Sequence, residues 1–302
     1  MMTDTKTISV VITAHRYCSE LAHTVTNVLE SEAEQVVIVT DQRSFDVDHF
    51  WRSVPSDPAS EDTITVVSET HDRGPSYYRN AGIECVDADI TLLLDYDCRA
   101  SASVVSEHKR AYKSDRIGAA AGVTELVTPN ETLVTRATKY SQFTDSYSFA
   151  ERGGELEWAP AANLSVRTDL AQELNFDERF PQRGGGEDID LCWRINNNGY
   201  EIVAVPDAVV THDVWDSFTG VLRRIFRWGR AETILISKHP DRRTSDPRRL
   251  FRLMKRVTTA DPPRLVPILL LFSLVYYSGT QWEKLQTGRL DLLSEKIQFE
   301  GP

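Results

Sequence analysis

The sequence predicts an α/β fold in which a mostly parallel sheet is flanked by helices. Short apolar runs that fit strands alternate in the first hundred residues with helix-length segments, which is typical of parallel sheets. Two of the runs also end in acidic residues. Right-handed crossovers place such strand ends along one edge of the sheet, where α/β proteins bind ligands. We therefore expect a nucleotide-sized site there.

The expected elements follow in a regular order. Strands are predicted at Ile8–Ile12, Gln35–Asp41, Ile64–Val67 and Ile90–Leu94, with an amphipathic helix at Ser19–Leu29. The second half is less regular. It is expected to contain a helix at Ser103–Tyr112, a strand near Ala119–Val123, the segment Asn163–Arg167, a helix stopped by Gly199 and a strand from there to Pro206.

Composition indicates a folded protein of one large domain or a domain with an appendage. The 302 residues are 41% hydrophobic and 26% charged, which is enough for a sizeable core. The cysteines Cys18, Cys85, Cys98 and Cys192 form no Cys-x-x-Cys pair and predict neither a zinc knuckle nor a disulfide framework. The N-terminus lacks the pattern of a secretory signal. We expect a reducing, cytoplasmic location for the active domain.

Charge is acidic overall and uneven along the chain. The net charge of -11 and pI of about 5.2 argue against a nucleic-acid partner, because an acidic surface repels phosphate backbones. The segment Arg242–Arg264 has eight cations against two acids, a balance of +6, which leaves the remainder at -17. The acidic excess is compatible with a salt-loving source.

The pair Asp95 and Asp97 is the first candidate site. Asp-x-Asp occurs four times, but only this pair follows a non-alternating apolar run, Ile90–Leu94, which fits a strand covered on both faces. Carboxylates at the carboxyl edge of an α/β sheet can hold a hard divalent cation that also takes phosphate oxygens. A solvated turn with ordinary aspartates is the alternative.

A glycine-rich loop followed by acids is the second candidate. Gly184–Gly186 precede Glu187 and Asp188 at the expected start of a helix. Asp188 there could be a general base, and positioned proton transfer contributes about 10² to 10⁴ in rate. Asp188 could instead only cap the helix, while Asp190 and Arg194 form a surface pair four residues apart.

His212 is expected just beyond the strand that ends at Pro206. A histidine in this position is more often a hydrogen-bonded structural residue than a ligand. With an aspartate pair available elsewhere, it is also a candidate third metal ligand through a neutral ring nitrogen.

Eight segments together resemble family 2 glycosyltransferases of the GT-A fold. They occur in the family's order, between about Ile8 and Arg230. The segments are Ser9–His15, Val37–Asp41, Arg73–Gly82, Leu92–Asp97, Ala161–Arg167, Phe176–Phe180, Gly185–Leu191 and Pro206–His212. Thr13–Arg16 and Gln42–Ser44 depart from the usual residues of the nucleoside pocket, which leaves the donor base open.

The resemblance implies a role for each site residue. Asp41 is expected at the nucleoside of a sugar donor, and Gly74, Arg79, Asn80 and Asn163 in the donor pocket. Asp95, Asp97 and His212 are expected to hold Mn²⁺ or Mg²⁺ on the diphosphate. Asp188 is expected to be the base that removes the acceptor proton, supported by Glu187. A single base opposite the leaving group predicts inversion at the anomeric carbon.

The C-terminal part suggests a membrane partner. Residues 265–282 carry no charge and just reach the roughly 18-residue threshold for a membrane span. We expect a transferase domain at 1–240, a basic juxtamembrane segment at 241–264, a transmembrane or interfacial helix at 265–282 and a polar tail at 283–302. A buried core helix is the alternative for 265–282.

These expectations combine into one function with two rivals. We expect a metal-dependent inverting glycosyltransferase that moves a sugar from a nucleotide-sugar donor to a lipid-linked glycan acceptor, at the cell membrane with its active domain facing the cytoplasm. The expected pathway is protein glycosylation or surface-glycan assembly. The alternatives are a nucleotidyltransferase and a non-catalytic, membrane-tethered scaffold that retains the fold.

Overall fold

The computed structural model of the chain describes residues 6–14, 16–31, 33–54, 62–71, 73–128, 130–215, 217–242 and 263–299. It divides into two compact units. Unit 1 consists of Met1–Pro129, Asp145–Gln182 and Glu187–Val214. Unit 2 consists of Asn130–Thr144, Arg183–Gly186 and Trp215–Pro302.

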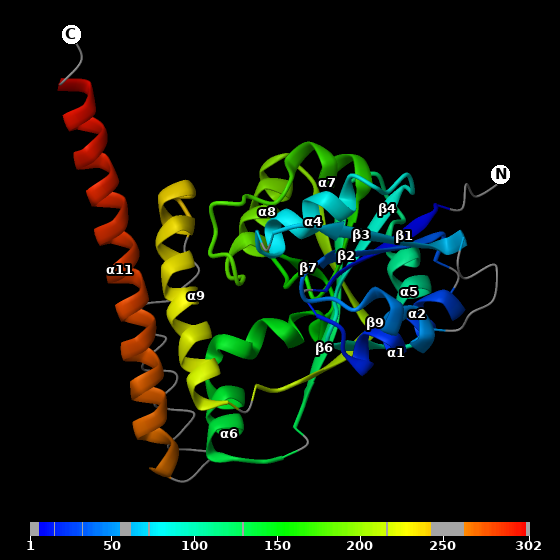
Figure 1. The fold of residues 1–302 in the computed structure, drawn as a ribbon, viewed down its shortest axis with the longest axis horizontal. Coiled ribbons are helices and arrows are strands. Elements are labelled where there is room, and N and C mark those ends of the chain that lie inside the picture. The colour runs from blue at the N-terminus through cyan, green and yellow to red at the C-terminus, as the bar shows by residue number, and fades with distance from the viewer. Residues whose placement is uncertain are drawn as a thin grey trace. The chain divides into compact units, whose positions relative to one another are not determined.

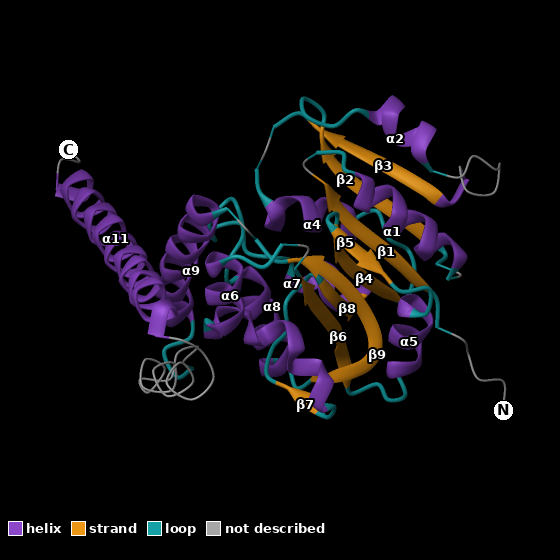
Figure 2. Cartoon of the chain, turned by 90° about the horizontal axis from the view of Figure 1, so that it is seen from below, coloured by secondary structure: helices purple, strands orange, loops and turns teal. Residues whose placement is uncertain are grey.

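Unit 1 is built on a nine-stranded sheet of order β3-β2-β1-β4-β8-β6-β9-β5, with β7 paired to β9 (Figure 2). The strands are β1 Ile8–Ala14, β2 Gln35–Asp41, β3 Ile64–Glu69, β4 Ile90–Asp95, β5 Cys98–Ala100, β6 Ile117–Val127, β7 Glu155–Leu156, β8 Asn163–Arg167 and β9 Glu201–Asp213. Strands β1 to β4 are parallel, and β8 runs antiparallel between β4 and β6. The expected α/β class with a mostly parallel sheet is confirmed.

Helices cover both faces of this sheet and create two cores. Those of unit 1 are α1 Ser19–Glu30, α2 Val47–Ser53, α4 Pro75–Ile83, α5 Val104–Ala111, α7 Thr168–Leu174 and α8 Glu187–Asn197. In β4, Leu92 and Leu94 enter the core under α1, α2 and α5, whereas Leu93 enters the core under α4, α7 and α8. Burial on both faces explains why this run is apolar at every position.

Strand β9 differs most from the expectation. It does not end at Pro206, but continues to Asp213, so His212 lies within the strand and not beyond it. Its pairing with β6 jumps from Val205 to Val209, which leaves a bulge at Pro206. Proline has no N–H for the ladder and therefore signals a strand end in a sequence, although bulges accommodate it.

Unit 2 contains a helix pair. Its elements are α6 Leu133–Tyr140, α9 Phe218–Lys238, η2 Pro263–Leu265 and α11 Val266–Phe299, and η1 Gln142–Arg152 crosses the boundary of the two units. Helices α9 and α11 lie side by side (Figures 1 and 2). A side chain at Gly229 would meet the backbone carbonyl of Tyr276, and one at Gly279 would meet that of Phe226. The two glycines therefore allow the backbones to approach closely.

The apolar run 265–282 forms the end of η2 and the first half of α11. Its residues Leu265, Leu269 and Phe272 are buried in a cluster with Val221 and Ile225 of α9. Among the described residues, no helix combines the length and apolar character needed to cross a membrane. Most of the expected basic segment 241–264 lies outside the described residues.

Candidate active site

The carboxyl ends of the parallel strands bring three predicted acids to one edge of the sheet. Strand β4 ends at Asp95, and Asp97 follows in the turn before β5. Asp95 lies beside Thr13 of β1, and Ala14 lies beside Thr40, the residue before Asp41 at the end of β2. The rim predicted from the strand ends is therefore present in unit 1.

His212 reaches this edge through the pairing of β9 with β5, in which it lies opposite Cys98. Its Nε2 is 3.3 Å from Oδ1 of Asp97, and its Nδ1 is 2.6 Å from the backbone carbonyl oxygen of Asp213. Burial lowers the pKa of His212, but the hydrogen bond that its protonated ring donates to Asp97 and the charges of Asp97 and Asp95 outweigh burial, and the net pKa is raised. The imidazole is thus held against a carboxylate.

This contact provides a test of whether the residues fit a divalent cation. Because Nδ1 donates to the Asp213 carbonyl, neutral His212 presents the lone pair of Nε2 toward the Asp97 carboxylate. Two acceptors that face each other need either a proton or a metal ion between them. Carboxylate oxygens with one imidazole suit Mn²⁺, and carboxylates suit Mg²⁺. The donor set therefore fits the expected ion.

The three predicted ligands are not assembled into a ready cluster. In the part of the chain that the structure describes, no group of three or more His, Cys, Asp or Glu residues is placed to hold a metal. Oδ1 of Asp95 instead accepts a hydrogen bond from Nη2 of Arg79 at 3.2 Å. Ligation by Asp95 would need its second oxygen or a small side-chain rotation.

Arg79 on α4 links this edge to the second candidate site. The buried guanidinium donates from Nη1 to Oε1 of Glu187 at 2.9 Å and from Nη2 to Asp95. Burial lowers the pKa of Arg79, but the charges of Asp95, Glu187 and Asp188 raise it by more than burial lowers it. The net pKa is raised, so Arg79 remains a cation. One guanidinium therefore lies among three carboxylates.

Glu187 and Asp188 begin α8 directly after three glycines. Gly184, Gly185 and Gly186 have φ angles of 82°, 135° and 87°, in the region that only glycine enters without a steric penalty. This backbone turns the chain into the first turn of α8. A helix N-terminus favours carboxylates through its dipole. The loop thus has a conformational reason for its three glycines.

Asp188 has the environment of a proton acceptor. Burial, followed by the charge of Glu187, raises its pKa to about 7, although Arg79 and the N–H groups of Ile189 and Ala161 act in the opposite direction. The Ile189 N–H donates to Oδ1 of Asp188 at 2.9 Å. The residue remains partly exposed to solvent. A half-buried carboxyl with a pKa near neutrality suits general base catalysis at pH 7.

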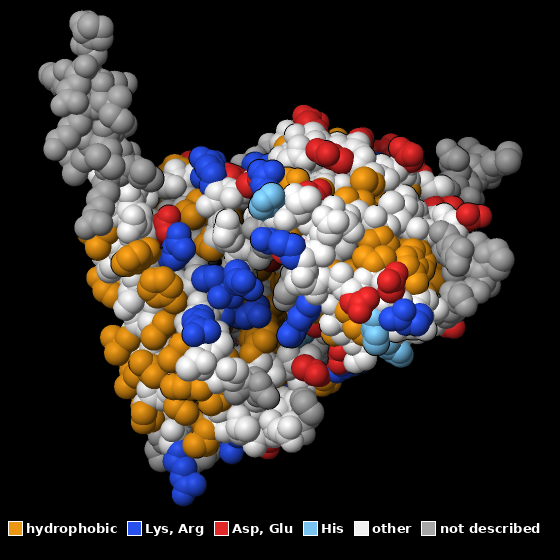
Figure 3. Space-filling model, in the orientation of Figure 1, with side chains coloured by type: hydrophobic (Ala, Val, Ile, Leu, Met, Phe, Trp, Pro, Cys, Tyr) orange, Lys and Arg blue, Asp and Glu red, His pale blue; other side chains and the backbone are white. Residues whose placement is uncertain are grey.

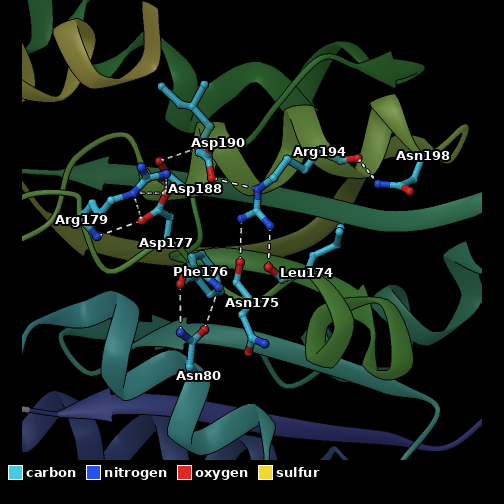
Figure 4. A network of polar contacts seen from close by, with 11 residues as sticks. Asn80, Leu174, Asn175, Phe176, Asp177, Arg179, Asp188, Asp190, Arg194 and Asn198 are labelled. Atoms are coloured by element: carbon cyan, nitrogen blue, oxygen red, sulfur yellow. Dashed lines mark hydrogen bonds and ion pairs between the residues drawn. The ribbon is translucent and has the colours of Figure 1, made fainter. Parts of the chain in front are cut away.

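Two of the predicted donor residues have structural contacts. The Asn80 amide donates to the carbonyl of Phe176 at 2.9 Å and accepts from its N–H at 2.7 Å (Figure 4). Gly74 is the N-cap residue directly before α4 and has a φ of 92°, and a Cβ there would lie 2.5 Å from the carbonyl oxygen of Gln182. Asn80 and Gly74 therefore fix the 176–182 segment against α4.

Asp41 ends β2 with its carboxylate held by the next turn. The N–H of Arg43 donates to Oδ1 of Asp41 at 2.9 Å, and the Arg43 Nε lies 3.3 Å from the same oxygen. These contacts, the backbone one first, lower the pKa of Asp41. The structure thus presents an ionised carboxylate at the sheet edge, as a partner for a nucleoside would require.

Asn163 has an internal role that the sequence did not reveal. Its side chain is buried and donates to the carbonyls of Val123 and Ala208 at 3.0 and 2.9 Å. Its Oδ1 lies 2.9 Å from Nε2 of His108, whose Nδ1 faces the Ser165 hydroxyl at 2.9 Å. Both amide hydrogens are therefore engaged, and a donor sugar could reach at most the backbone of Asn163.

His108 was not predicted as a site residue. Burial lowers its pKa to about 4, although the hydrogen bond that His108 donates to Asn163 acts in the opposite direction, so His108 is neutral at pH 7. Because Oδ1 of Asn163 can only accept, the proton is assigned to Nε2, and Nδ1 accepts from Ser165. In the sequence, His108 has only the helical spacing of a core residue, and nothing indicates its partners.

The alternative reading of Asp190 and Arg194 as a pair four residues apart is confirmed, but its placement on the surface is wrong. The ion pair forms at 2.9 Å, but Asp190 is 0% exposed. Arg194 also donates to the backbone carbonyls of Leu174 and Asn175 at 2.5 and 2.6 Å (Figure 4). The pair therefore ties α8 to the end of α7, which a spacing of four residues does not disclose.

A family comparison identifies this arrangement. The protein family described as "Glycosyltransferase like family 2" matches residues 5–231, which include all ten predicted site residues. The chain belongs to glycosyltransferase family 2. The arrangement of acids in unit 1 is thus the candidate active site of a glycosyltransferase.

Curated relatives of this glycosyltransferase are distant. The Pre-mycofactocin glycosyltransferase of Mycobacterium tuberculosis is 24% identical over 186 residues, which cover 59% of this chain and 38% of the relative. The Probable glycosyltransferase YdaM of Bacillus subtilis is 23% identical over 172 residues, which cover 55% and 40%. The matched part of the glycosyltransferase therefore spans about two fifths of the length of these relatives.

Solved structures share the fold of this glycosyltransferase. The mannosyltransferase PcManGT from Pyrobaculum calidifontis, in complex with GDP-Man and Mn²⁺, has a TM-score of 0.55 at 15% identity and covers 99% of this chain and 89% of its own. GalNAc-T7 with UDP, GalNAc and Mn²⁺ has a TM-score of 0.55 at 14% identity. The match covers 88% of this chain and 56% of the GalNAc-T7 chain. The GT-A fold expected from the sequence is confirmed.

Proposed function

We propose that this glycosyltransferase moves one sugar from a nucleoside-diphosphate sugar to a hydroxyl of a lipid-linked glycan. The reaction uses a divalent cation and inverts the anomeric carbon. The observation that carries the proposal is the position of Arg79 among Asp95, Glu187 and Asp188. The guanidinium links the acids of the sheet edge to the half-buried carboxyl of α8. A leaving-group site and a base thus belong to one arrangement.

In this mechanism Asp188 takes the proton of the acceptor hydroxyl. The hydroxyl oxygen forms a bond to the anomeric carbon while the bond from that carbon to the diphosphate oxygen breaks, and the nucleoside diphosphate leaves with the bonding electrons. A pKa of about 7 makes Asp188 a stronger base than an ordinary aspartate, yet leaves about half of it ionised at neutral pH. Attack opposite the leaving group inverts the anomeric carbon.

Glu187 and Arg79 hold this base in position. The Glu187 carboxylate raises the proton affinity of Asp188, and its ion pair with Arg79 keeps the first turn of α8 against α4. Arg79 limits how far the pKa of Asp188 rises. We assign Arg79 as a positioning residue between the base and the diphosphate.

Asp95, Asp97 and His212 would hold the cation at the carboxyl edge of the sheet. When bound, Mn²⁺ or Mg²⁺ supplies Lewis-acid neutralisation of the negative charge on the departing diphosphate. Asp41, Gly74, Asn80 and the backbone of Asn163 would line the donor pocket. The solved structures similar to this chain carry GDP-Man and Mn²⁺, or UDP and Mn²⁺, which supports a nucleotide-sugar donor here.

The proposed location is the cytoplasmic side of the cell membrane. A lipid-linked acceptor would require unit 2 to operate beside a bilayer, and the cations of this unit support such a partner. The four cysteines are free thiols, in keeping with a reducing compartment. The product would be a glycan for protein glycosylation or surface-glycan assembly.

The test is release of nucleoside diphosphate from a panel of sugar nucleotides with Mn²⁺, Mg²⁺ or chelator, with and without polyprenyl-phosphate-linked glycans. We expect lipid-dependent and metal-dependent release, reduced about 10² to 10⁴-fold in Asp188→Asn. Glu173→Gln, which changes an exposed acid on α7, is the matched control. Release of pyrophosphate instead would identify a nucleotidyltransferase, and donor binding without turnover would identify a scaffold.

A further inference from the structure

Helix α11 carries an apolar stripe on the side opposite its contact with α9. Leu270, Leu274, Tyr277 and Leu285 are 44% to 64% exposed, and Trp282 is 49% exposed. The first three and Leu285 recur at offsets of four, seven and fifteen residues, which places them on one side of a helix. At 1.5 Å per residue the stripe is about 22 Å long. Trp282, at an offset of twelve from Leu270, lies at the margin of this side, and we call the five residues the α11 stripe.

The inner side of the same helix is already occupied. Leu269 and Phe272 are buried, Gly279 lies against α9, and Arg230 of α9 forms an ion pair with Glu283 at 2.7 Å. Between Val266 and Trp282 the exposed residues of the helix are therefore apolar with the exception of Ser278, as the buried residues also are. Surface helices of soluble domains usually have a polar outer side, so this outer side indicates a partner.

Charge decides which partner fits. Unit 2 contains nineteen Lys and Arg against ten Asp and Glu, a balance of +9, whereas unit 1 contains fifteen against thirty-five, a balance of -20. Figure 3 shows Lys and Arg side chains beside apolar ones over the region of α9 and α11. Two copies joined through the α11 stripe would bring like charges together, whereas anionic lipid headgroups attract this unit.

We propose that the α11 stripe docks flat on an anionic lipid bilayer. Leucines of the stripe enter the boundary between headgroups and acyl chains, and Tyr277 and Trp282 take the interfacial position that suits aromatic rings with a polar group. The proposal rests on the proposed function in one respect, that a lipid-linked acceptor lies in a bilayer. It places the enzyme on the membrane surface without a span.

The test is flotation of the full chain with vesicles of phosphatidylcholine alone or with one third phosphatidylglycerol. The variant Leu270→Gln/Leu274→Gln/Leu285→Gln removes the stripe at exposed positions. Leu133→Gln, at a residue of α6 that is 47% exposed, is the matched control. We expect wild type and control to float with the anionic vesicles, less so as salt increases, and the triple variant to bind on the order of ten to a hundredfold more weakly.

A second measurement reports the depth of docking. Lipids brominated near the headgroup should quench tryptophan fluorescence in the wild type, and Trp282→Phe should lose this quenching while it still floats. Flotation of the triple variant at the wild-type level, equal binding to neutral vesicles, or no binding by the wild type would overturn the proposal. So would a dimer in sedimentation velocity that the triple variant abolishes.

The two measurements test membrane docking and catalysis independently of each other. Flotation needs no turnover, so a chain that floats through its stripe but releases no nucleoside diphosphate would overturn the proposed function alone. A chain that turns over donor in detergent, with the triple variant equally active there, but does not float would overturn the docking alone.

Discussion

The guanidinium of Arg79 donates from Nη1 to Oε1 of Glu187 at 2.9 Å, and both side chains are buried. The second arm of the guanidinium, Nη2, contacts Asp95 at the carboxyl end of β4. Two buried charged side chains must remain paired, because the loss of one leaves the other charge without either solvent or a counterion. This pair therefore joins the stability of unit 1 to the geometry of its candidate active site.

Replacement of Arg79 by Gln should shift the pH dependence of turnover upward. Arg79 lowers the pKa of Asp188, so without this cation the base holds its proton to a higher pH and the acidic limb of the kcat profile moves to higher pH. Stability should fall by about 3 to 5 kcal/mol, because buried Glu187 loses its partner. Arg79→Lys, which keeps a charge, should shift the profile less. An unchanged profile in a folded Arg79→Gln enzyme would contradict the coupling.

Asp188→Asn should make the protein more stable above pH 7. The pKa of Asp188 is about 7 in the folded chain and near 3.8 when unfolded, so the folded state binds this proton more tightly. The stabilisation that the folded state gains from the protonated Asp188 carboxyl is complete below about pH 4 and is lost as the pH rises through 7. The difference in melting temperature between variant and wild type should therefore grow in favour of the variant from pH 5 to pH 8.

Asp190→Asn is the contrasting change two residues away. Asp190 is also buried, but it is paired with Arg194, so removal of its charge should destabilise the protein at pH 8. Thermal unfolding of both variants on the same pH series is the measurement. A loss of stability in both variants at pH 8 would mean that the ionised carboxylate of Asp188 stabilises the folded protein, which contradicts the raised pKa.

His108 should make unit 1 sensitive to acid. Its pKa is about 4 in the folded chain against 6.5 unfolded, so its contribution is complete above pH 6.5 and is lost as the pH falls toward 4. The shift corresponds to about 3 kcal/mol. His108→Gln should be less stable at pH 7.5, yet should lose less stability between pH 6.5 and 4.5. Parallel curves for wild type and variant would contradict a neutral, buried imidazole.

Gly229→Ala should disrupt the α9–α11 pair, because a Cβ there meets the backbone carbonyl of Tyr276. Overpacking of this kind costs about 1 to 3 kcal/mol. Gly288→Ala on α11 is the matched control, because a Cβ there has nothing within 4 Å. It should be neutral or stabilising by up to about 1 kcal/mol through helix propensity. Helical circular dichroism on heating should separate the two variants.

Strands buried on both sides were predictable because their apolar runs carry the information locally. Strand β2 begins and ends at the expected Gln35 and Asp41, and β4 is one residue longer than expected. The acids at their ends follow directly from the parallel order. Helix α8 likewise begins after its glycines and ends before Gly199, as the pattern indicated.

Contacts between distant segments were not predictable. Asn163 looked like a donor residue because the resemblance placed it there, whereas its partners His108 and Ala208 come from α5 and β9. The burial of Asp190 depends on the contact of its partner Arg194 with α7. The position of His212 depends on a bulge in β9 at Pro206, where the sequence indicated the end of the strand. In each case the environment of the side chain depends on a segment more than ten residues away in sequence, where periodicity carries no signal.

The three consecutive positive φ angles at Gly184–Gly186 have a genetic consequence. Every missense change in a glycine codon introduces an L-amino acid, and each such residue would be strained by about 1 kcal/mol or more in this backbone. The strain would fall directly before Glu187 and Asp188. A library of random variants selected for activity should therefore show a gap of three adjacent codons, whereas a chemically synthesised chain with D-alanine at Gly184 or Gly186 could keep the same turn.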